Sequence, residues 1–309
     1  MSTKYPQGII TSTPPYTTGT FSGVWTLEQL AKNYYYYGDG VANSLRFRSS
    51  ASAYLNRTPA SASNRQTWTW SGWVKRGTIG TRQHLFGGGS NATSTDHTYI
   101  EFYSSGTILV ESYSSSASIF QLETSQVFRD FSAWYHVVLA LDTTQATSSN
   151  RVKLYINGVQ VTSFGTTNYP SLNYSGGVNA SAPHRIGSYS ADYGPSYFDG
   201  YMADINFIDG QALDPSYFGV IAPATGVWSP KKYTGTYGTN GFHLNFSNGT
   251  STTTLGYDSS GNSNNWTTNN ISLTAGSTYD WMLDSPTPFA GSSYGVGNYA
   301  VLNGASVGT

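Results

Sequence analysis

The chain contains no cysteine, so disulfide bonds, thiolate metal sites and a cysteine nucleophile are excluded. Charge is also scarce, because 10% of the residues are charged and the net charge is −1. Nucleic-acid binding needs a basic face that displaces counterions from phosphates, and this composition does not supply one. No apolar run approaches the ~20 residues of a membrane-spanning helix, and none of secretory length opens the chain. We therefore expect no nucleic-acid partner, no membrane span and no ordinary cleaved signal.

What the sequence does contain is typical of a turn-rich β protein. Of its 309 residues, 34 are glycine and 15% are aromatic, and few stretches have a helical pattern. The length suits one large sandwich with an extension, or two small domains.

The segment 134–158 has the clearest strand pattern in the chain. Both alternating faces of residues 134–141 are largely apolar, which predicts a strand inside a sandwich, with His136 packed there and not catalytic. A polar loop follows over 142–150, and residues 152–156 alternate again. Asn157-Gly158 then predicts a type I′ turn into a further strand.

Other segments predict further strands and turns. Residues 198–213 predict a strand that ends at Asp209-Gly210, with one face formed by Tyr201, Ala203, Ile205 and Phe207. Residues 44–58 predict the first strand pair, and residues 67–76 the next strand. Residues 225–246 predict a turn-rich hairpin that ends in a strand, and GGGS at 87–90 predicts a turn.

These blocks together resemble the concanavalin A-like, laminin G-like jelly rolls. In that family a Trp-Tyr-His strand, an Asn-Gly hairpin and a final F-x-G-x-x-x-D-I strand occur in this order, and the resemblance covers Asn43 to Leu213. It implies an all-β, concanavalin A-like jelly-roll sandwich over residues 41–285. An arm with one short helix would precede it at 1–40, and a Gly/Ser-rich extension would follow at 286–309. We expect residues 214–285 to complete the sandwich and not to form a second domain.

The start of the chain suggests an attachment segment. Residues 1–23 are rich in Pro, Thr and Ser and should be extended, and Thr26 then caps a short amphipathic helix. SGVWTLEQ at 22–29 resembles the opening of phage tail and virion structural proteins, and blocks within 225–267 resemble marine phage structural proteins. The resemblance implies a homo-oligomeric virion protein attached through Trp25, Leu27 and Leu30. The alternative is an ordinary helix packed on the sandwich.

Catalytic motifs are sparse. Glucanases with this sandwich use an E-x-D-x-E strand, and the four glutamates, Glu28, Glu101, Glu111 and Glu123, do not form that pattern. No G-x-S-x-G, H-E-x-x-H or phosphate-binding glycine motif is present, although spacing leaves a Ser-His-Asp arrangement open. We therefore expect a protein that is not an enzyme.

Loop residues supply candidate binding sites. For carbohydrate, whose rings stack on flat aromatic side chains, the candidates are Tyr189, Tyr193 and Tyr197 on one loop, and His97 and Tyr99 near another. For calcium, which takes carboxylate and amide oxygens, they are Asp142 with Asn150, and Asp192 with Asp199. The alternatives are subunit contacts for the aromatic residues and backbone-bonded turns for the Asp and Asn residues.

Three functions remain open on the sequence alone. The first is a virion appendage, a tail fibre, head fibre or decoration protein, whose sandwich adheres to host surface glycans. The second is a purely structural decoration or connector protein that contacts other virion proteins. The third is a glycan hydrolase with an unusual carboxylate pair. Exposed tyrosines around an open pocket favour the first, and two facing carboxylates favour the third.

Overall fold

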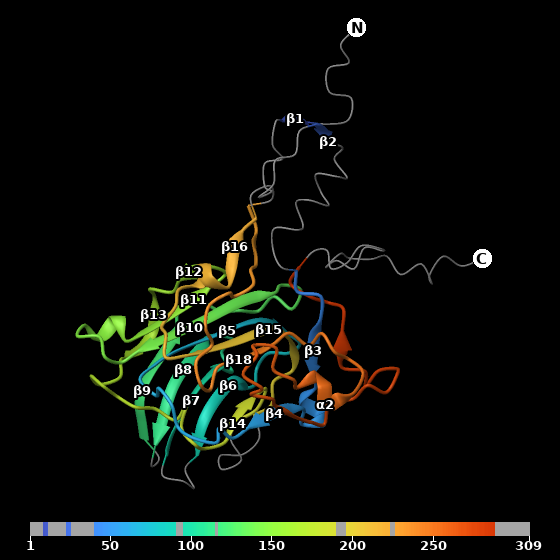
Figure 1. Cartoon of the computed structure of the whole chain (residues 1–309). Coiled ribbons are helices and arrows are strands. Elements are labelled where there is room, and N and C mark those ends of the chain that lie inside the picture. Colours follow the sequence, from blue (N-terminus) through green and yellow to red (C-terminus); the bar gives the residue numbers. More distant parts are fainter. Residues whose placement is uncertain are drawn as a thin grey trace.

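The computed structural model is a sandwich of two large antiparallel β-sheets (Figure 1). It describes residues 9–11, 23–25, 40–90, 95–114, 117–189, 196–222 and 226–287. Each large sheet has eight strands, which confirms the all-β sandwich predicted from the sequence.

The first large sheet, sheet 1, has β5 and β15 at its centre, and β18 pairs with β15 beside the main path. Its strands in spatial order are β12 (Val159–Gln160), β11 (Val152–Ile156), β10 (Tyr135–Asp142), β5 (Thr67–Arg76), β15 (Gly200–Asp209), β3 (Ser44–Phe47) and β20 (Trp281–Met282), with β18 (Phe242–Leu244).

The second large sheet, sheet 2, packs on one face of sheet 1. Its strands in spatial order are β13 (Phe164–Asn168), β9 (Ala117–Thr124), β8 (Ile108–Ser114), β7 (Thr95–Phe102), β6 (Gln83–Ser90), β14 (His184–Ile186), β4 (Tyr54–Arg57) and β19 (Thr267–Asn269).

The remaining elements are short. Two separate strand pairs are β1 (Ile9–Thr11) with β2 (Gly23–Trp25), and β16 (Gly219–Ile221) with β17 (Trp228–Pro230). The helical elements are η1 (Ser49–Ala51), η3 (Ser148–Asn150), η5 (Pro215–Tyr217) and α2 (Thr252–Leu255). None of the helices in the described ranges has the length and apolar character of a membrane crossing.

The core lies between the two sheets and is rich in aromatic side chains. Phe207 of β15 stacks on Phe242 of β18 at 5.6 Å and contacts Phe86 of β6 at 5.5 Å, so the rings connect the sheets. Each ring is almost fully buried. A buried Phe stabilises the folded chain by about 1.5–3 kcal/mol relative to an exposed one.

The 134–158 segment folds as predicted. β10 lies between β11 and β5, the chain turns at Asn157-Gly158, and both turn residues have positive φ angles of 49° and 83°. Those angles are the ones that a type I′ turn requires. His136 is 1% exposed, so its predicted packing inside the protein is confirmed.

The predicted pairing of the two strands in 44–58 is wrong. β3 belongs to sheet 1 and β4 to sheet 2, because η1 and the left-handed residue Ser52 (φ 56°) carry the chain from one sheet to the other. The predicted 225–246 hairpin is also wrong. β17 pairs with the preceding strand, β16, and β18 pairs with β15.

The predicted faces of 198–213 change at a bulge. The pairing of β15 with β5 shifts register between Ala203 and Asn206, and Asp204 has a φ of 48°. Met202 therefore faces the core before the bulge, and Ile205 and Phe207 face it afterwards. A bulge inserts one extra residue and so reverses the alternation of the side chains that follow.

GGGS at 87–90 is not a turn, because these residues end strand β6. A Cβ at Gly88 would lie 2.4 Å from the ring of His184, so glycine allows this ring to lie against the strand. The predicted helix near Thr26 lies outside the described residues. The described α-helix, α2, has a Ser251 capping box that the sequence interpretation overlooked.

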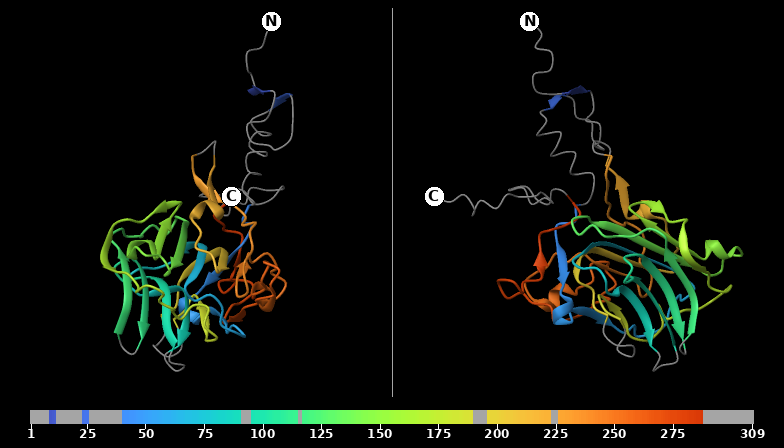
Figure 2. Two further views of the ribbon diagram at one scale, coloured as in Figure 1. Left: turned by 60° about the vertical axis from the view of Figure 1, so that its left-hand side comes forward. Right: turned by 180° about the vertical axis from the view of Figure 1, so that it is seen from behind.

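The segment after β15 contributes to both sheets. β19 pairs with β4 and β20 pairs with β3, so the segment 267–282 lies along the edge formed by these early strands (Figure 2, dark orange to red). Arg46 and Arg48 hold this segment by bonding to buried Asp280.

Candidate functional site

The outer face of sheet 2 carries polar and aromatic side chains that do not belong to the core. In β7, Ile100 and Phe102 point into the core, so His97, Tyr99 and Glu101 lie on the opposite face. In β8, Ile108 and Val110 point inward, so Leu109, Glu111 and Tyr113 lie on the outer face. β7 and β8 pair with each other, which brings these two sets side by side.

A pocket with a volume of about 340 Å³ lies on this face. Pockets that bind small molecules fall in the range of about 300–1,000 Å³. The pocket is lined by Arg82, His84, Tyr99, Tyr103, Leu109, Glu111, Tyr113, Gln121, Tyr189 and Ser196. Four of these residues are tyrosines.

Aromatic rings form the floor of the pocket. Tyr99 and Tyr189 meet edge to face at 5.2 Å, and Tyr189 lies 4.3 Å from His84. His97 lies edge-on to Tyr189 at 4.5 Å from behind the pocket. Edge-to-face pairs add about 0.5–1.5 kcal/mol beyond the area that they bury, so these contacts help to hold the rings in place.

A chain of polar contacts crosses the pocket. Arg82 Nε donates to Glu101 Oε1 at 2.8 Å, and Arg82 Nη2 lies 2.6 Å from the same oxygen. Nη2 also donates to the Tyr99 hydroxyl at 3.1 Å, and that hydroxyl donates in turn to Glu111 Oε2. Two carboxylates are thereby joined through one guanidinium and one phenol.

Burial changes the titration of these groups. It raises the pKa of Glu101 to about 7, although Arg82 acts in the opposite direction. Burial also lowers the pKa of His84 well below its ordinary value, so this ring is neutral at pH 7. Burial and the hydrogen bond to Glu111 raise the pKa of Tyr99, so its hydroxyl keeps its proton.

The arrangement is suited to binding and not to the two-carboxylate hydrolysis of glycosides. That reaction needs two carboxyl groups that both reach the substrate. The side chain of Glu101 has no exposed surface, because Arg82 and His84 cover it. Among the described residues, Glu111 is the one carboxylate in the pocket wall.

Comparison with known protein families identifies the sandwich. The family profile of the concanavalin A-like lectin/glucanases superfamily matches residues 48–216, more than half of the chain. The chain belongs to this superfamily. The fold class predicted from the sequence is therefore confirmed. A separate comparison with curated proteins found no match.

Solved structures similar to this superfamily member come from varied organisms. A candidate carbohydrate-binding protein from Bacteroides ovatus is 14% identical, with a TM-score of 0.39, over 57% of this chain and 46% of its own. A heptameric SAP-like pentraxin from Limulus polyphemus is 15% identical, with a TM-score of 0.42, over 56% of this chain and 78% of its own. Mouse laminin α1 domains LG4-5 are 15% identical, with a TM-score of 0.37, over 56% and 44%. The chain thus spans about half the length of the first and third of these.

The structure brings together three of the residues predicted to bind carbohydrate in this superfamily member. Tyr189 and Tyr99 line the pocket, and His97 supports both rings. Tyr197 is not among the described residues that line the pocket, and its ring lies 6.2 Å from that of Tyr54. Tyr193 lies outside the described residues.

The sequence interpretation overlooked the other residues of the pocket wall, namely Arg82, His84, Tyr103, Leu109, Glu111, Tyr113, Gln121 and Ser196. The signal was present in the alternation of β8, where Leu109, Glu111 and Tyr113 interrupt core residues at every second position. The pairing of β8 with β9, which places Gln121 opposite Glu111, was not readable from local sequence.

Two of the predicted calcium ligands, Asp142 and Asp199, accept hydrogen bonds from within the protein. Asp142 accepts from the Thr144 amide at 3.1 Å, as an Asx-turn residue does, and from the Gln145 side chain at 2.6 Å, and Asn150 ends η3. Asp199 accepts from the Ser49 amide at 3.2 Å, and Asp192 lies outside the described residues. The described part of the chain holds no group of three or more metal-binding side chains. Of the predicted attachment residues, Leu27 and Leu30 lie outside the described residues, and Trp25 ends β2.

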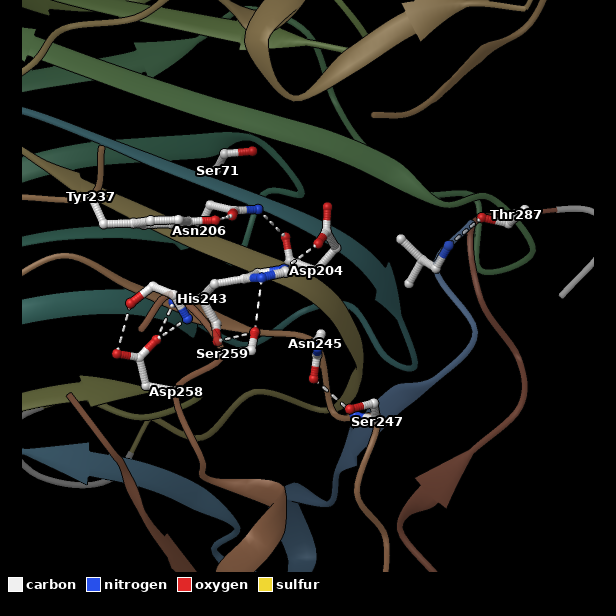
Figure 3. A network of polar contacts seen from close by, with 12 residues as sticks. Ser71, Asp204, Asn206, Tyr237, His243, Asn245, Ser247, Asp258, Ser259 and Thr287 are labelled. Atoms are coloured by element: carbon white, nitrogen blue, oxygen red, sulfur yellow. Dashed lines mark hydrogen bonds and ion pairs between the residues drawn. The ribbon is translucent and has the colours of Figure 1, made fainter. Parts of the chain in front are cut away.

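A Ser-His-Asp arrangement, which the sequence left open, is present on the other side of the sandwich (Figure 3). Ser259 Oγ lies 2.9 Å from His243 Nδ1, and His243 Nε2 lies 2.6 Å from Asp204 Oδ1. The bulge in β15 places Asp204 toward His243, and Tyr237 stacks on the histidine ring.

The geometry of this arrangement is structural. A serine nucleophile faces Nε2 of its histidine, whereas Ser259 faces Nδ1 and lies 3.0 Å from the His243 carbonyl oxygen. The Ser259 and Ser260 amides already donate at 2.8 Å to the His243 carbonyl oxygen and to Asp258, so neither is available to an oxyanion. The network ties the loop that begins at Asp258 to β15 and β18.

Proposed function

We propose that this protein binds glycans in the pocket on the outer face of sheet 2 and is not an enzyme. The observation that carries the proposal is the wall of four tyrosines with Glu111 and Gln121 among them. A sugar ring presents an apolar C–H face that stacks on an aromatic ring, and hydroxyl groups that bond to carboxylate and amide groups. Membership of a superfamily that contains lectins supports the same function.

We further propose that the protein is a virion appendage in which many copies adhere to host surface glycans. This part rests on the likeness of residues 22–29 and 225–267 to phage structural proteins. Many weak sites on one particle give useful avidity through their effective concentration. A calcium ion that assists binding belongs to the same proposal, with Asp192 and Asp199 as its ligands.

Glycan-array binding of the purified chain tests the first proposal. Tyr113→Ala removes a partly exposed wall tyrosine, and Tyr217→Ala removes a tyrosine that is 47% exposed on η5, far from the pocket. We expect Tyr113→Ala to weaken binding by about tenfold, as loss of one aromatic contact does, and Tyr217→Ala to leave it unchanged. An array without any bound glycan, or equal binding by both variants, contradicts the proposal.

Cryo-electron microscopy of intact particles tests the virion role. We expect the sandwich to project outward with residues 1–40 in a socket on the particle. Absence of the chain from the particles would contradict the virion role and favour a free lectin. Burial of the pocket against a neighbouring subunit favours the purely structural decoration protein.

A further inference from the structure

We propose that the pocket selects uncharged glycans and rejects sugars that carry a carboxylate or sulfate group. This inference rests on the glycan-binding function proposed above and names the class of ligand. It follows from the way in which the charged groups of the pocket are already engaged.

Arg82 is the one cation in the described pocket wall, and one of the edges through which its guanidinium can hold an anion is occupied. A guanidinium holds a carboxylate best through two parallel N–H groups on one edge. The Nε and Nη2 groups of Arg82 form such an edge, and both lie within 2.8 Å of Glu101 Oε1. Nη2 is further engaged with Tyr99. An acidic sugar that used this edge would have to displace Glu101, whose side chain has no exposed surface.

Glu111 brings a carboxylate to the pocket wall, and none of the cationic side chains that the structure describes bonds to it. Its Oε2 accepts from the neutral Tyr99 hydroxyl, which brings no positive charge to it. Gln121 stands opposite Glu111 on β9 and offers an uncharged donor and acceptor. A carboxylate beside an amide pairs well with sugar hydroxyls, whereas a second anion beside Glu111 is repelled.

The neighbouring cation is also engaged. Arg185 of β14 donates to the Tyr189 carbonyl oxygen at 2.9 Å, and its guanidinium lies 4.6 Å above the ring of Tyr54. It is directed to the region of β4 and is not part of the pocket wall. His84, the remaining basic group of the wall, is neutral at pH 7 because it is buried.

Matched pairs of glycans test the selectivity. The probes are neutral gluco-, galacto- and manno-oligosaccharides, each beside a counterpart that carries a uronate or a 6-sulfate. Binding is measured at pH 8, where Glu101 is ionised and neutralises Arg82. We expect each bound neutral glycan to bind about tenfold more tightly than its anionic counterpart.

Two further measurements assign this preference to the pocket. Glu111→Gln keeps the size of the side chain and its ability to hydrogen-bond but removes the charge. It should reduce the difference in affinity between neutral and anionic glycans by about threefold or more. In the unaltered protein, raising the salt concentration from about 0.02 M to about 0.5 M should strengthen binding of the anionic members by screening the repulsion. The salt series needs no variant and therefore remains decisive if Glu111→Gln fails to fold.

The outcomes separate this inference from the proposed function. Equal or tighter binding of anionic members overturns the selectivity and leaves glycan binding intact. A preference for neutral glycans that neither Glu111→Gln nor salt changes places its cause outside this pocket and also overturns the inference. Absence of binding to every member removes the proposed function and the inference together.

Discussion

The indole Nε1 of Trp228 donates a hydrogen bond to Nδ1 of His136 at 3.0 Å. Because Nδ1 accepts, the neutral imidazole carries its proton on Nε2, which donates to Ser71 Oγ at 2.9 Å. The β16–β17 hairpin is thereby connected to the centre of sheet 1. His136 also stacks on Trp73 at 4.7 Å, so the ring is enclosed on several sides.

Trp228→Phe should destabilise the protein by about 1–2 kcal/mol, because it leaves the buried Nδ1 of His136 without a donor. Urea denaturation measures the change in the free energy of unfolding. Ile221→Ala is the control, since Ile221 pairs with Trp228 but is 60% exposed and should change stability by less than about 0.5 kcal/mol. Equal effects of the two substitutions would contradict a specific role for the indole N–H group.

Acidification should destabilise the protein through His136. Burial lowers the pKa of His136 to about 3, whereas an unfolded histidine titrates near 6.5. Between these values the unfolded chain binds the proton and the folded chain does not, so stability is lost as the pH falls below about 6.5. From pH 7 to pH 5 the loss from this group is about 2 kcal/mol.

Denaturation of the unaltered chain and of His136→Gln at pH 7, 6 and 5 isolates this group. The raised pKa of Glu101 favours the folded state on acidification, but it acts equally in both proteins and cancels in their difference. The stability advantage of the unaltered chain should shrink as the pH falls. Parallel pH profiles would show that His136 does not remain neutral in the folded chain.

Asp280→Ala should destabilise the protein by about 3 kcal/mol, because it removes the shared partner of two arginines. Asp280 is fully buried, and its Oδ1 accepts from Arg46 Nε at 3.1 Å and from Arg48 Nε at 2.7 Å. Asp280→Asn keeps one acceptor oxygen without the charge and should be intermediate. Thermal unfolding of the three proteins checks this order, and an Ala variant as stable as the unaltered chain would refute it.

Arg76→Met should leave stability within about 1 kcal/mol of the unaltered chain or increase it. The guanidinium is buried, no carboxylate in the described part of the chain pairs with it, and burial lowers the pKa of Arg76 to about 10. Its Nη1 donates to the Phe128 carbonyl oxygen at 2.6 Å, and the group lies over the ring of Phe102. Met keeps the packing and removes the cost of the buried charge. A loss above about 2 kcal/mol in urea denaturation would show that the charge stabilises the fold.

The local sequence determined the elements that depend only on residues close together in the chain. The β10–β11 hairpin follows from an apolar strand, an alternating strand and Asn157-Gly158, which readily adopts the positive φ angles of the turn. The all-β class follows from composition and from the repeated strand patterns. Tyr99, Tyr189 and His97 were nominated because aromatic residues beside polar turns are typical of carbohydrate sites.

Tertiary structure alone decided the pocket and the pairings between distant strands. Glu111 and Gln121 face each other because β8 and β9 pair, and Arg82 meets Glu101 because β6 and β7 pair. The sequence gives each strand a pattern but not its partner, because partners are selected by the burial of side chains along the whole length of two sheets. The same limit explains three wrong predictions: the pairing of β3 with β4, the unbroken alternation of faces along β15, and a turn at the glycines of β6. In each case a contact between segments far apart in the chain prevailed over the local preference.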